Sequence, residues 1–208
     1  MIPLFVDCSG RSIVIFGGGD VAVRKALRFS GEADVHIISR SFSDACARLP
    51  VRFTTMDIST ATDDAISALL DPAFLVVGAL SNPGENNRIG ELCRKKGILF
   101  NNADGEAGDV IIPAVTGGKN YIVAVTTRGH SPAVSRFIRQ DIETRFPAMD
   151  AMIDLQDRLR AELKNTCPDQ ARRSAVLWQV LEDREIWKQL EQSPSDAWEV
   201  VRQRYLHG

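Results

Sequence analysis

A glycine-rich turn near the start of the chain has the residue types and spacing of a ligand-binding site. The turn has the spacing Gly17-x-Gly19-x-x-Ala22. It follows an apolar, β-branched run at 12–16 and precedes a helical pattern at 21–29, the context in which a dinucleotide-binding turn occurs. Such glycines let the backbone turn tightly and approach a pyrophosphate, while the first N–H groups of the helix attract phosphate. We therefore predict that this turn binds a nicotinamide cofactor and is more than a structural bend.

The end of the second predicted strand should hold another part of this cofactor. The strand covers Val35–Ile38 and is followed by Ser39, Arg40 and Ser41. An acid at this point normally binds the ribose hydroxyls of NAD, yet Asp34 stands at the start of the strand. Arg40 could stack on adenine or bind a 2′-phosphate, so these residues alone leave NAD and NADP open.

A carboxylate follows a later predicted strand, Ile98–Phe100. It belongs to the segment Asn101-Asn102-Ala103-Asp104. Ligands of open parallel sheets bind outside the carboxyl ends of the strands, which places Asp104 at the mouth of the predicted site. The alternative, which physics alone favours, is an aspartate that caps a turn. Asp104 is therefore a candidate catalytic group with an ordinary structural explanation beside it.

A second candidate cluster lies at 126–132. It combines the cation of Arg128, the imidazole of His130 and a helix start at Ser131-Pro132, which together favour an anionic ligand. A capped helix start with a solvated arginine explains the same residues equally well. The sequence has no HExxH, no GxSxG and no acidic metal cluster, so we predict no resident metal.

Strand and helix patterns alternate through the first half of the chain. After the elements already named, we expect a helix at 63–70, a strand at 74–77 and a helix at 86–96 with Gly97 as its C-cap. Short connections between such units predict a parallel sheet that is covered on both faces.

The pattern changes in the second half. Two β-rich segments, Val110–Val115 and Tyr121–Thr127, flank a hairpin-like turn. Helices follow from Ser131, with breaks expected at Pro147 and Pro168. The predicted fold is α/β, with a Rossmann-type parallel sheet at 1–112, a small β/α dimerisation segment at 113–146 and a helical region at 147–208.

The composition excludes several classes of function. The 208 residues include 25 basic and 27 acidic side chains, for a net charge of −2, so neither nucleic acid nor a membrane surface is the expected partner. Cys8, Cys46, Cys93 and Cys167 are far apart and form no metal or redox motif, which is typical of free thiols in a reducing cytosol. No apolar run approaches the ~20 residues of a membrane span. We expect a cytoplasmic protein.

Several short motifs stand in order along residues 1–145. They are Pro3-Leu4-Phe5 with Gly10-Arg11, the turn at 17–22 with Arg24-Lys25-Ala26, Asn101–Asp104, Pro113-Ala114, and Gly129-His130-Ser131-Pro132 with Arg136. In this order they resemble the precorrin-2 dehydrogenase/sirohydrochlorin ferrochelatase family, the dehydrogenase–chelatase module of siroheme synthase. An ordered set of motifs is far more specific than the glycine turn alone.

The resemblance implies oxidation of precorrin-2 to sirohydrochlorin with NAD and, in many members, insertion of Fe²⁺ to give siroheme. It implies that Asp104 acts in both steps, as a base for the macrocycle proton and in the exchange of metal for pyrrole protons. It places NAD contacts on Asp20, Val21, Arg40 and Ser41. The family also lacks the strand-end acid, so NAD is the expected cofactor. The full predicted cofactor set is Gly17, Gly18, Gly19, Asp20, Val21, Ser39, Arg40, Ser41 and Ala79.

The resemblance also implies a homodimer in which the segment after the nucleotide-binding domain builds the interface and completes the partner's site. The tetrapyrrole substrate carries several carboxylates, which suits substrate contacts by Arg128, His130, Ser131 and Arg136. The chain departs from its relatives at 79–83, where it reads Ala-Leu-Ser-Asn-Pro and relatives often carry acidic residues.

Three alternatives remain open from the sequence. The first is a dehydrogenase served by a separate chelatase. The second is a nucleotide-sensing regulatory module without chemistry, such as a gating domain of a transporter. The third is a dehydrogenase of another small anionic substrate. A sensing module explains the glycine turn, but it gives no purpose to Asp104 or to the turn at 129–132.

Overall fold

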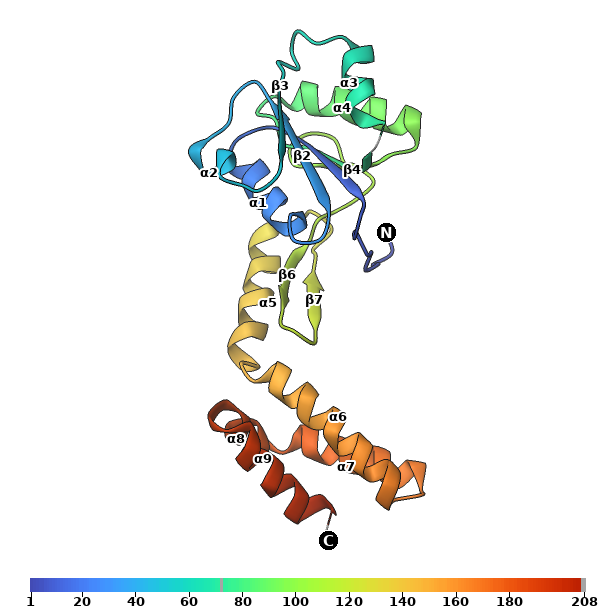
Figure 1. Ribbon diagram of the computed structural model, residues 1–208, viewed down its shortest axis with the longest axis vertical. Helices are drawn as coiled ribbons and strands as arrows, with labels where there is room; N and C mark the ends of the chain where they lie inside the picture. Colours follow the sequence, from blue (N-terminus) through green and yellow to red (C-terminus); the bar gives the residue numbers. More distant parts are fainter. Residues whose placement is uncertain (72, 207–208) are drawn as a thin grey trace. The chain divides into compact units, whose positions relative to one another are not determined.

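The computed structural model describes residues 1–71 and 73–206, which form two compact units (Figure 1). The first unit is Met1–Ile112, and the second begins at Pro113. Residues 113–146 group with the helices that follow them instead of forming a unit of their own. Their role in dimerisation stays a prediction.

A five-stranded parallel sheet forms the centre of the first unit. Its strands are β1 (Ser12–Phe16), β2 (Asp34–Ser39), β3 (Arg52–Thr55), β4 (Ala73–Gly78) and β5 (Leu99–Asn102). They lie in the order β3-β2-β1-β4-β5, and every neighbouring pair is parallel. This is the predicted Rossmann-type arrangement, in which the chain builds one side of the sheet and then crosses from β3 to β4 on the other. Ligands of such sheets bind where that direction reverses, beyond the carboxyl ends of β1 and β4.

Helices cover both faces of the sheet. Successive side chains of a strand point to opposite faces, so the apolar strands have side chains to bury on each side. The helices of this unit are α1 (Asp20–Phe29), α2 (Asp44–Ala47), α3 (Asp63–Leu70) and α4 (Pro83–Lys96). Ile13 and Ile15 of β1 pack in a core with the buried alanines of α1, whereas Val14 and Phe16 pack in a second core with residues of α3 and α4. These four apolar side chains of β1 are fully buried, and each stabilises the fold by roughly 1.5–3 kcal/mol.

The helix ends follow the capping rules that the sequence suggests. Gly97 ends α4 in the left-handed conformation with φ of 69°, as predicted. The side chains of Thr62 and Asn82 cap the starts of α3 and α4. The Pro83 start of α4 lies three residues before the predicted one, because proline at the first helical position needs no N–H partner.

The elements α2 and β3 are not predicted from the sequence. β3 is an edge strand that pairs with β2, and its residues Arg52, Phe53 and Thr55 are exposed. An exposed edge strand needs no apolar run, so it leaves no hydrophobic pattern. Helix α2 has four residues, too few for a helical period.

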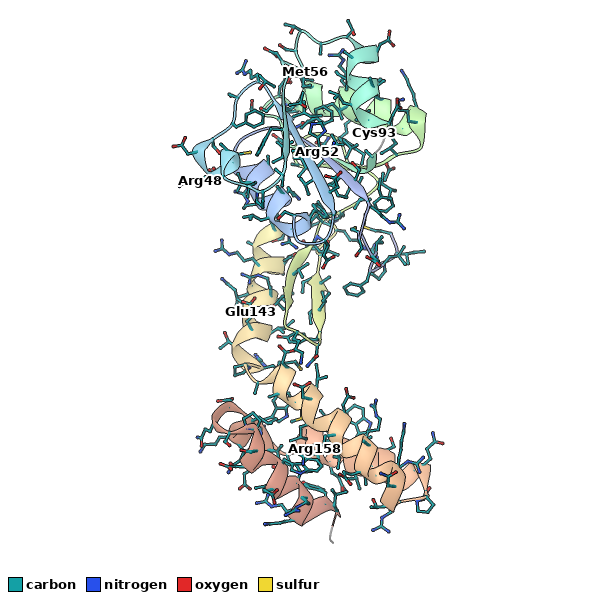
Figure 2. The ribbon with its side chains drawn as sticks, in the orientation of Figure 1. Arg48, Arg52, Met56, Cys93, Glu143 and Arg158 are labelled. Carbon is teal, nitrogen blue, oxygen red and sulfur yellow. The ribbon has the colours of Figure 1, made fainter. Side chains whose placement is uncertain are left out.

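The four cysteines are free thiols, as expected. Cys46 and Cys93 are buried, and Figure 2 labels Cys93 in the first unit. Burial raises the pKa of the Cys93 thiol to about 12. These two residues therefore act as small apolar core residues and not as nucleophiles.

The second unit starts with a hairpin and a long helix. Strands β6 (Ala114–Gly117) and β7 (Ile122–Val125) are antiparallel, and both pack against α5 (Pro132–Arg145). The strand expected from Val110 begins only at Ala114. Ser131 caps α5 by accepting a hydrogen bond from the N–H of Val134 at 3.3 Å, as predicted for a Ser-Pro helix start.

The rest of the second unit is helical. Its elements are α6 (Met149–Thr166), α7 (Gln170–Glu182), α8 (Arg184–Gln192), α9 (Pro194–Val201) and a π-helical turn, η1 (Arg202–Leu206). The predicted breaks at Pro147 and Pro168 fall between helices. Leu159, Ile186 and Trp198 are buried in one core, and the guanidinium of Arg158 lies 3.9 Å from the centre of the Trp198 ring (Figure 2). Among the helices of the described residues, none combines the length and apolarity that crossing a bilayer requires.

The packing of α4 on β5 gives a stability test. A Cβ added at Gly90 would lie 2.7 Å from the buried ring of Phe100. Gly90→Ala should therefore lower the free energy of unfolding by about 1–3 kcal/mol, the usual cost of overpacking a core. Urea unfolding followed by circular dichroism measures this change.

Gly31 offers the matched control, because a Cβ there meets no atom within 4 Å. Gly31→Ala should leave the unfolding midpoint unchanged or raise it slightly. Equal midpoints for the two variants would contradict close packing between Gly90 and Phe100.

Candidate functional site

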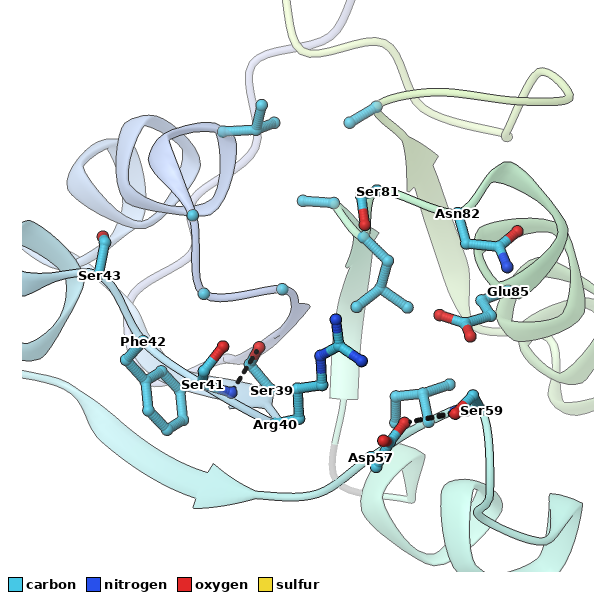
Figure 3. A pocket seen from close by; sticks show the side chains of 18 of the residues that line it. Ser39, Arg40, Ser41, Phe42, Ser43, Asp57, Ser59, Ser81, Asn82 and Glu85 are labelled. Carbon is cyan, nitrogen blue, oxygen red and sulfur yellow. Dashed lines mark hydrogen bonds between the residues drawn. The ribbon is translucent and has the colours of Figure 1, made fainter.

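A cavity of about 840 Å³ opens at the carboxyl ends of the sheet strands (Figure 3). Every residue predicted to contact the cofactor lines it, and so does Asp104. Its walls come from the loops after β1, β2, β3, β4 and β5, so residues far apart in the sequence meet here. The lining residues are Gly17–Val21, Ser39–Ser43, Met56–Ser59, Ala79–Asn82, Glu85, Ala103 and Asp104.

The first two glycines of the turn fix its place between two neighbouring loops. Gly17 has φ of 126°, and its N–H donates to the carbonyl oxygen of Ile38 at 2.8 Å. A Cβ at Gly17 would lie 2.4 Å from the carbonyl oxygen of Ala79, and one at Gly18 would lie 2.1 Å from that of Ser41. No side chain fits at either position, so both glycines are required by the close approach of backbone to backbone.

The third glycine faces open space. A Cβ built on Gly19 meets no atom within 4 Å, and Gly19 lines the cavity. Gly19 is the N-cap of α1, where no side chain caps the helix, unlike Thr62 at α3 or Asn82 at α4. The first N–H groups of an α-helix have no partner within the helix, and they carry a partial positive charge. The start of α1 therefore suits the pyrophosphate of a dinucleotide.

The β2 side of the cavity carries a cation beside a carboxylate. The Arg40 side chain extends into the cavity from the end of β2, as Figure 3 shows. Asp57, which follows β3, lines the same part and accepts hydrogen bonds from Ser59, at 3.0 Å from N–H and 2.6 Å from Oγ. These bonds and the charge of Arg40 lower the pKa of the Asp57 carboxyl below its usual value. Asp57 cannot be recognised from the sequence, because the exposed edge strand β3 before it has no apolar pattern.

A buried asparagine joins the loops after β4 and β5. The Asn86 side chain is fully buried at the start of α4. Its Oδ1 accepts from the N–H of Leu80 at 3.0 Å, and its Nδ2 donates to the carbonyl oxygens of Leu80 at 3.0 Å and Asp104 at 3.1 Å. These bonds set the position of Asp104 relative to the β4 loop. In the sequence, Asn86 is only an asparagine within a helical pattern, which does not indicate this role.

Asp104 does not cap the turn in which it stands. Its N–H donates to Oδ1 of Asn102 at 3.2 Å, so the capping side chain is that of Asn102. Asn87 accepts from the N–H of Glu106 at 2.9 Å and closes the loop from α4. Across residues 1–71 and 73–206, nothing hydrogen-bonds to the Asp104 carboxylate, which is exposed and lines the cavity. The carboxylate is thus available to a ligand.

The predicted substrate residues Arg128, His130, Ser131 and Arg136 lie in the second unit. Arg128 has φ of 55°, and the side chains of Arg128, His130 and Arg136 are exposed. The backbone of Ser131 is held by the hydroxyl of Thr127, with both bonds at 2.9 Å. This geometry describes a capped helix start that displays two arginines and an imidazole to solvent, and their contact with substrate stays a prediction.

Known proteins resemble the chain in sequence and in fold. Residues 4–114 match a family described as "Putative NAD(P)-binding". The chain is 42% identical over 201 residues to the "Precorrin-2 dehydrogenase" of Methanosarcina barkeri, covering 94% of this chain and 89% of that protein. It is 33% identical over 189 residues to a "Siroheme synthase" of Ectopseudomonas mendocina, covering 86% of this chain but 38% of that longer protein. The solved structure "SirC, precorrin-2 dehydrogenase" shares the fold, with a TM-score of 0.69 at 20% identity over 98% of this chain and 100% of that one.

The roles of Gly17 and Gly19 can be distinguished by experiment. Gly19→Val adds a side chain in open space, so it should leave folding unchanged and weaken dinucleotide binding by about tenfold or more through crowding. Gly17→Val should instead destabilise the first unit, because its Cβ collides with the carbonyl of Ala79 and its φ is positive. Isothermal titration with NAD and thermal melting measure the two effects. Unchanged NAD affinity in a folded Gly19→Val protein would place the pyrophosphate elsewhere.

Proposed function

The chain belongs to the precorrin-2 dehydrogenase family, and on that premise we propose that it oxidises precorrin-2 to sirohydrochlorin with NAD in siroheme biosynthesis. The observation that carries the proposal is a single cavity lined by both the dinucleotide-binding turn and a carboxylate that is free to meet a substrate. A module that only sensed nucleotides would need the turn but not the carboxylate.

The cavity fits NAD in three parts. The turn at Gly17–Val21 and the start of α1 hold the pyrophosphate. The loop at Ser39–Ser41 holds the adenosine half, and the loop after β4, with Ala79, holds the nicotinamide half, because strand order places these loops on opposite sides of the turn. Bound NAD supplies the acceptor for the hydride that leaves the macrocycle.

Asp104 takes the proton that balances this oxidation. Two electrons and one proton leave precorrin-2 as hydride, and a second proton must go to a base. The Asp104 carboxylate lines the cavity near the β4 loop, where Asn86 holds its backbone at 3.1 Å. Since the carboxylate is also exposed, it can pass the proton on to water.

We propose that the site is completed in a homodimer. Ile122 on β7 and Val134, Phe137 and Ile138 on α5 are large apolar side chains exposed in the single chain. Strand β7 and helix α5 pack against each other, and exposed apolar surface on neighbouring elements is typical of protein interfaces. The partner subunit would then contribute the cluster at 128–136, whose cations suit the carboxylates of the substrate. We also propose that the enzyme works in the cytoplasm.

Insertion of Fe²⁺ into sirohydrochlorin is a second candidate reaction of the same site. Fe²⁺ is a substrate there and replaces two pyrrole protons, which Asp104 can accept in turn and release to water. Within the described residues, no group of three or more histidine, cysteine or acidic side chains is arranged to hold a metal ion. Metal delivery would therefore depend on the macrocycle nitrogens.

Anaerobic absorbance tests the proposed function. Purified protein with NAD and enzymatically made precorrin-2 should give the sirohydrochlorin spectrum together with an equal amount of NADH. NAD binding without turnover would support a sensing module or a different substrate. Adding Fe²⁺ to the product, with and without protein, then distinguishes a bifunctional enzyme from a dehydrogenase served by a separate chelatase.

Replacement of Asp104 tests its role as the base. Asp104→Asn keeps the shape of the side chain and removes the base, so kcat for precorrin-2 oxidation should fall by about 10²–10⁴-fold. The Kd for NAD should change little, because the proposed role concerns the macrocycle. Glu106→Gln, in the same loop but outside the cavity lining, is the matched control and should keep full activity. Full activity of Asp104→Asn would rule out a catalytic carboxylate at this position.

A further inference from the structure

The β2 side of the cavity contains an acid that comes from a different strand than usual. In many nucleotide-binding sheets, an acid at the end of the second strand binds the adenosine ribose. Here that strand ends with Ser39 and Arg40, and the carboxylate comes from Asp57 after β3. The N–H of Met56 donates to the carbonyl oxygen of Ser39 at 3.0 Å, which places Asp57 directly beside the end of β2.

Ser59 orients the Asp57 carboxylate and leaves one of its oxygens without a hydrogen bond. Both hydrogen bonds from Ser59 end on Oδ1, and Figure 3 shows the one from the Ser59 hydroxyl. Within the described chain, Oδ2 has no hydrogen-bond partner. The Ser59 bonds and Arg40 lower the pKa of the Asp57 carboxyl, so it is ionised at neutral pH. An oriented carboxylate with a free oxygen on a cavity wall is suited to accept a hydrogen bond from a hydroxyl group.

Arg40 alone would favour a phosphorylated ligand. A guanidinium binds phosphate well, so an arginine in this position would attract the 2′-phosphate of NADP. The negative charge of Asp57 attracts the Arg40 guanidinium and repels any anion placed beside it. A phosphate near Asp57 would meet a fixed negative charge, whereas a ribose hydroxyl would meet an acceptor.

We propose that Asp57 makes this site select NAD over NADP, by accepting a hydrogen bond from an adenosine ribose hydroxyl on Oδ2 and repelling a phosphate at the same place. The inference rests on the proposed function, in which this cavity holds the dinucleotide. Asp57 thus takes the part of the acid that is absent from the end of β2, and Ser59 is the residue that positions it.

Calorimetric titration of the full chain with NAD and with NADP tests this inference. The wild type should bind NAD more tightly. Asp57→Asn keeps the shape of the side chain and removes its charge, so it should weaken NAD binding by about tenfold, strengthen NADP binding, and reduce or reverse the preference. Asp64→Asn removes the same charge from the exposed surface of α3, outside the cavity lining, and should leave both affinities unchanged.

Two further variants sharpen the test. Ser59→Ala removes the 2.6 Å bond from Oγ and should reduce the preference less than Asp57→Asn does. Adding Arg40→Ala to Asp57→Asn should abolish the gain in NADP affinity, because the guanidinium is the group that binds the phosphate. Thermal melting shows whether each variant remains folded.

The outcomes separate the two proposals. If the wild type binds NAD but Asp57→Asn keeps the same ratio of affinities, or weakens both cofactors equally, Asp57 does not determine specificity and the dehydrogenase proposal is untouched. If the folded wild type binds neither cofactor, the proposed function and this inference both fail.

Discussion

The close approach of one glycine turn to two neighbouring loops is the constraint on which the site depends. Gly17 and Gly18 lie so near the carbonyl oxygens of Ala79 and Ser41 that no Cβ fits. This packing closes the backbone around the carboxyl ends of β1, β2 and β4 and orients the start of α1 toward the cavity. Only Gly19 remains open, so the same three-residue run both builds the wall and leaves room for a ligand.

The chemical half of the site depends on amide side chains that hold backbone groups. Asn86 joins the loops after β4 and β5, and Asn102 takes the capping role in the turn of Asp104. Asp104 is therefore positioned through its backbone, while its carboxylate has no hydrogen-bond partner among the described residues. A preorganised carboxylate that makes no structural bond can act as a base without breaking the loop that carries it.

The features that the sequence predicts correctly are those with a local signal. The apolar run of β1, the glycine spacing and the Ser131-Pro132 helix start each depend on a few adjacent residues, and the structure has all three. The sequence contains no signal for Asp57, because the edge strand before it is exposed and shows no apolar pattern. The role of Asn86 is not predictable either, because hydrogen bonds from a helical side chain to neighbouring loops leave no periodic signal.

A crystal structure of the chain with bound NAD tests most directly whether this cavity is a dinucleotide site built by the glycine turn. We expect the pyrophosphate against the start of α1 beside Gly19, the adenosine near Arg40 and the nicotinamide toward Asp104. A dinucleotide bound outside the cavity, or inside it with the nicotinamide at the Arg40 end, would contradict the assignment of Asp104 to the reacting half of the site.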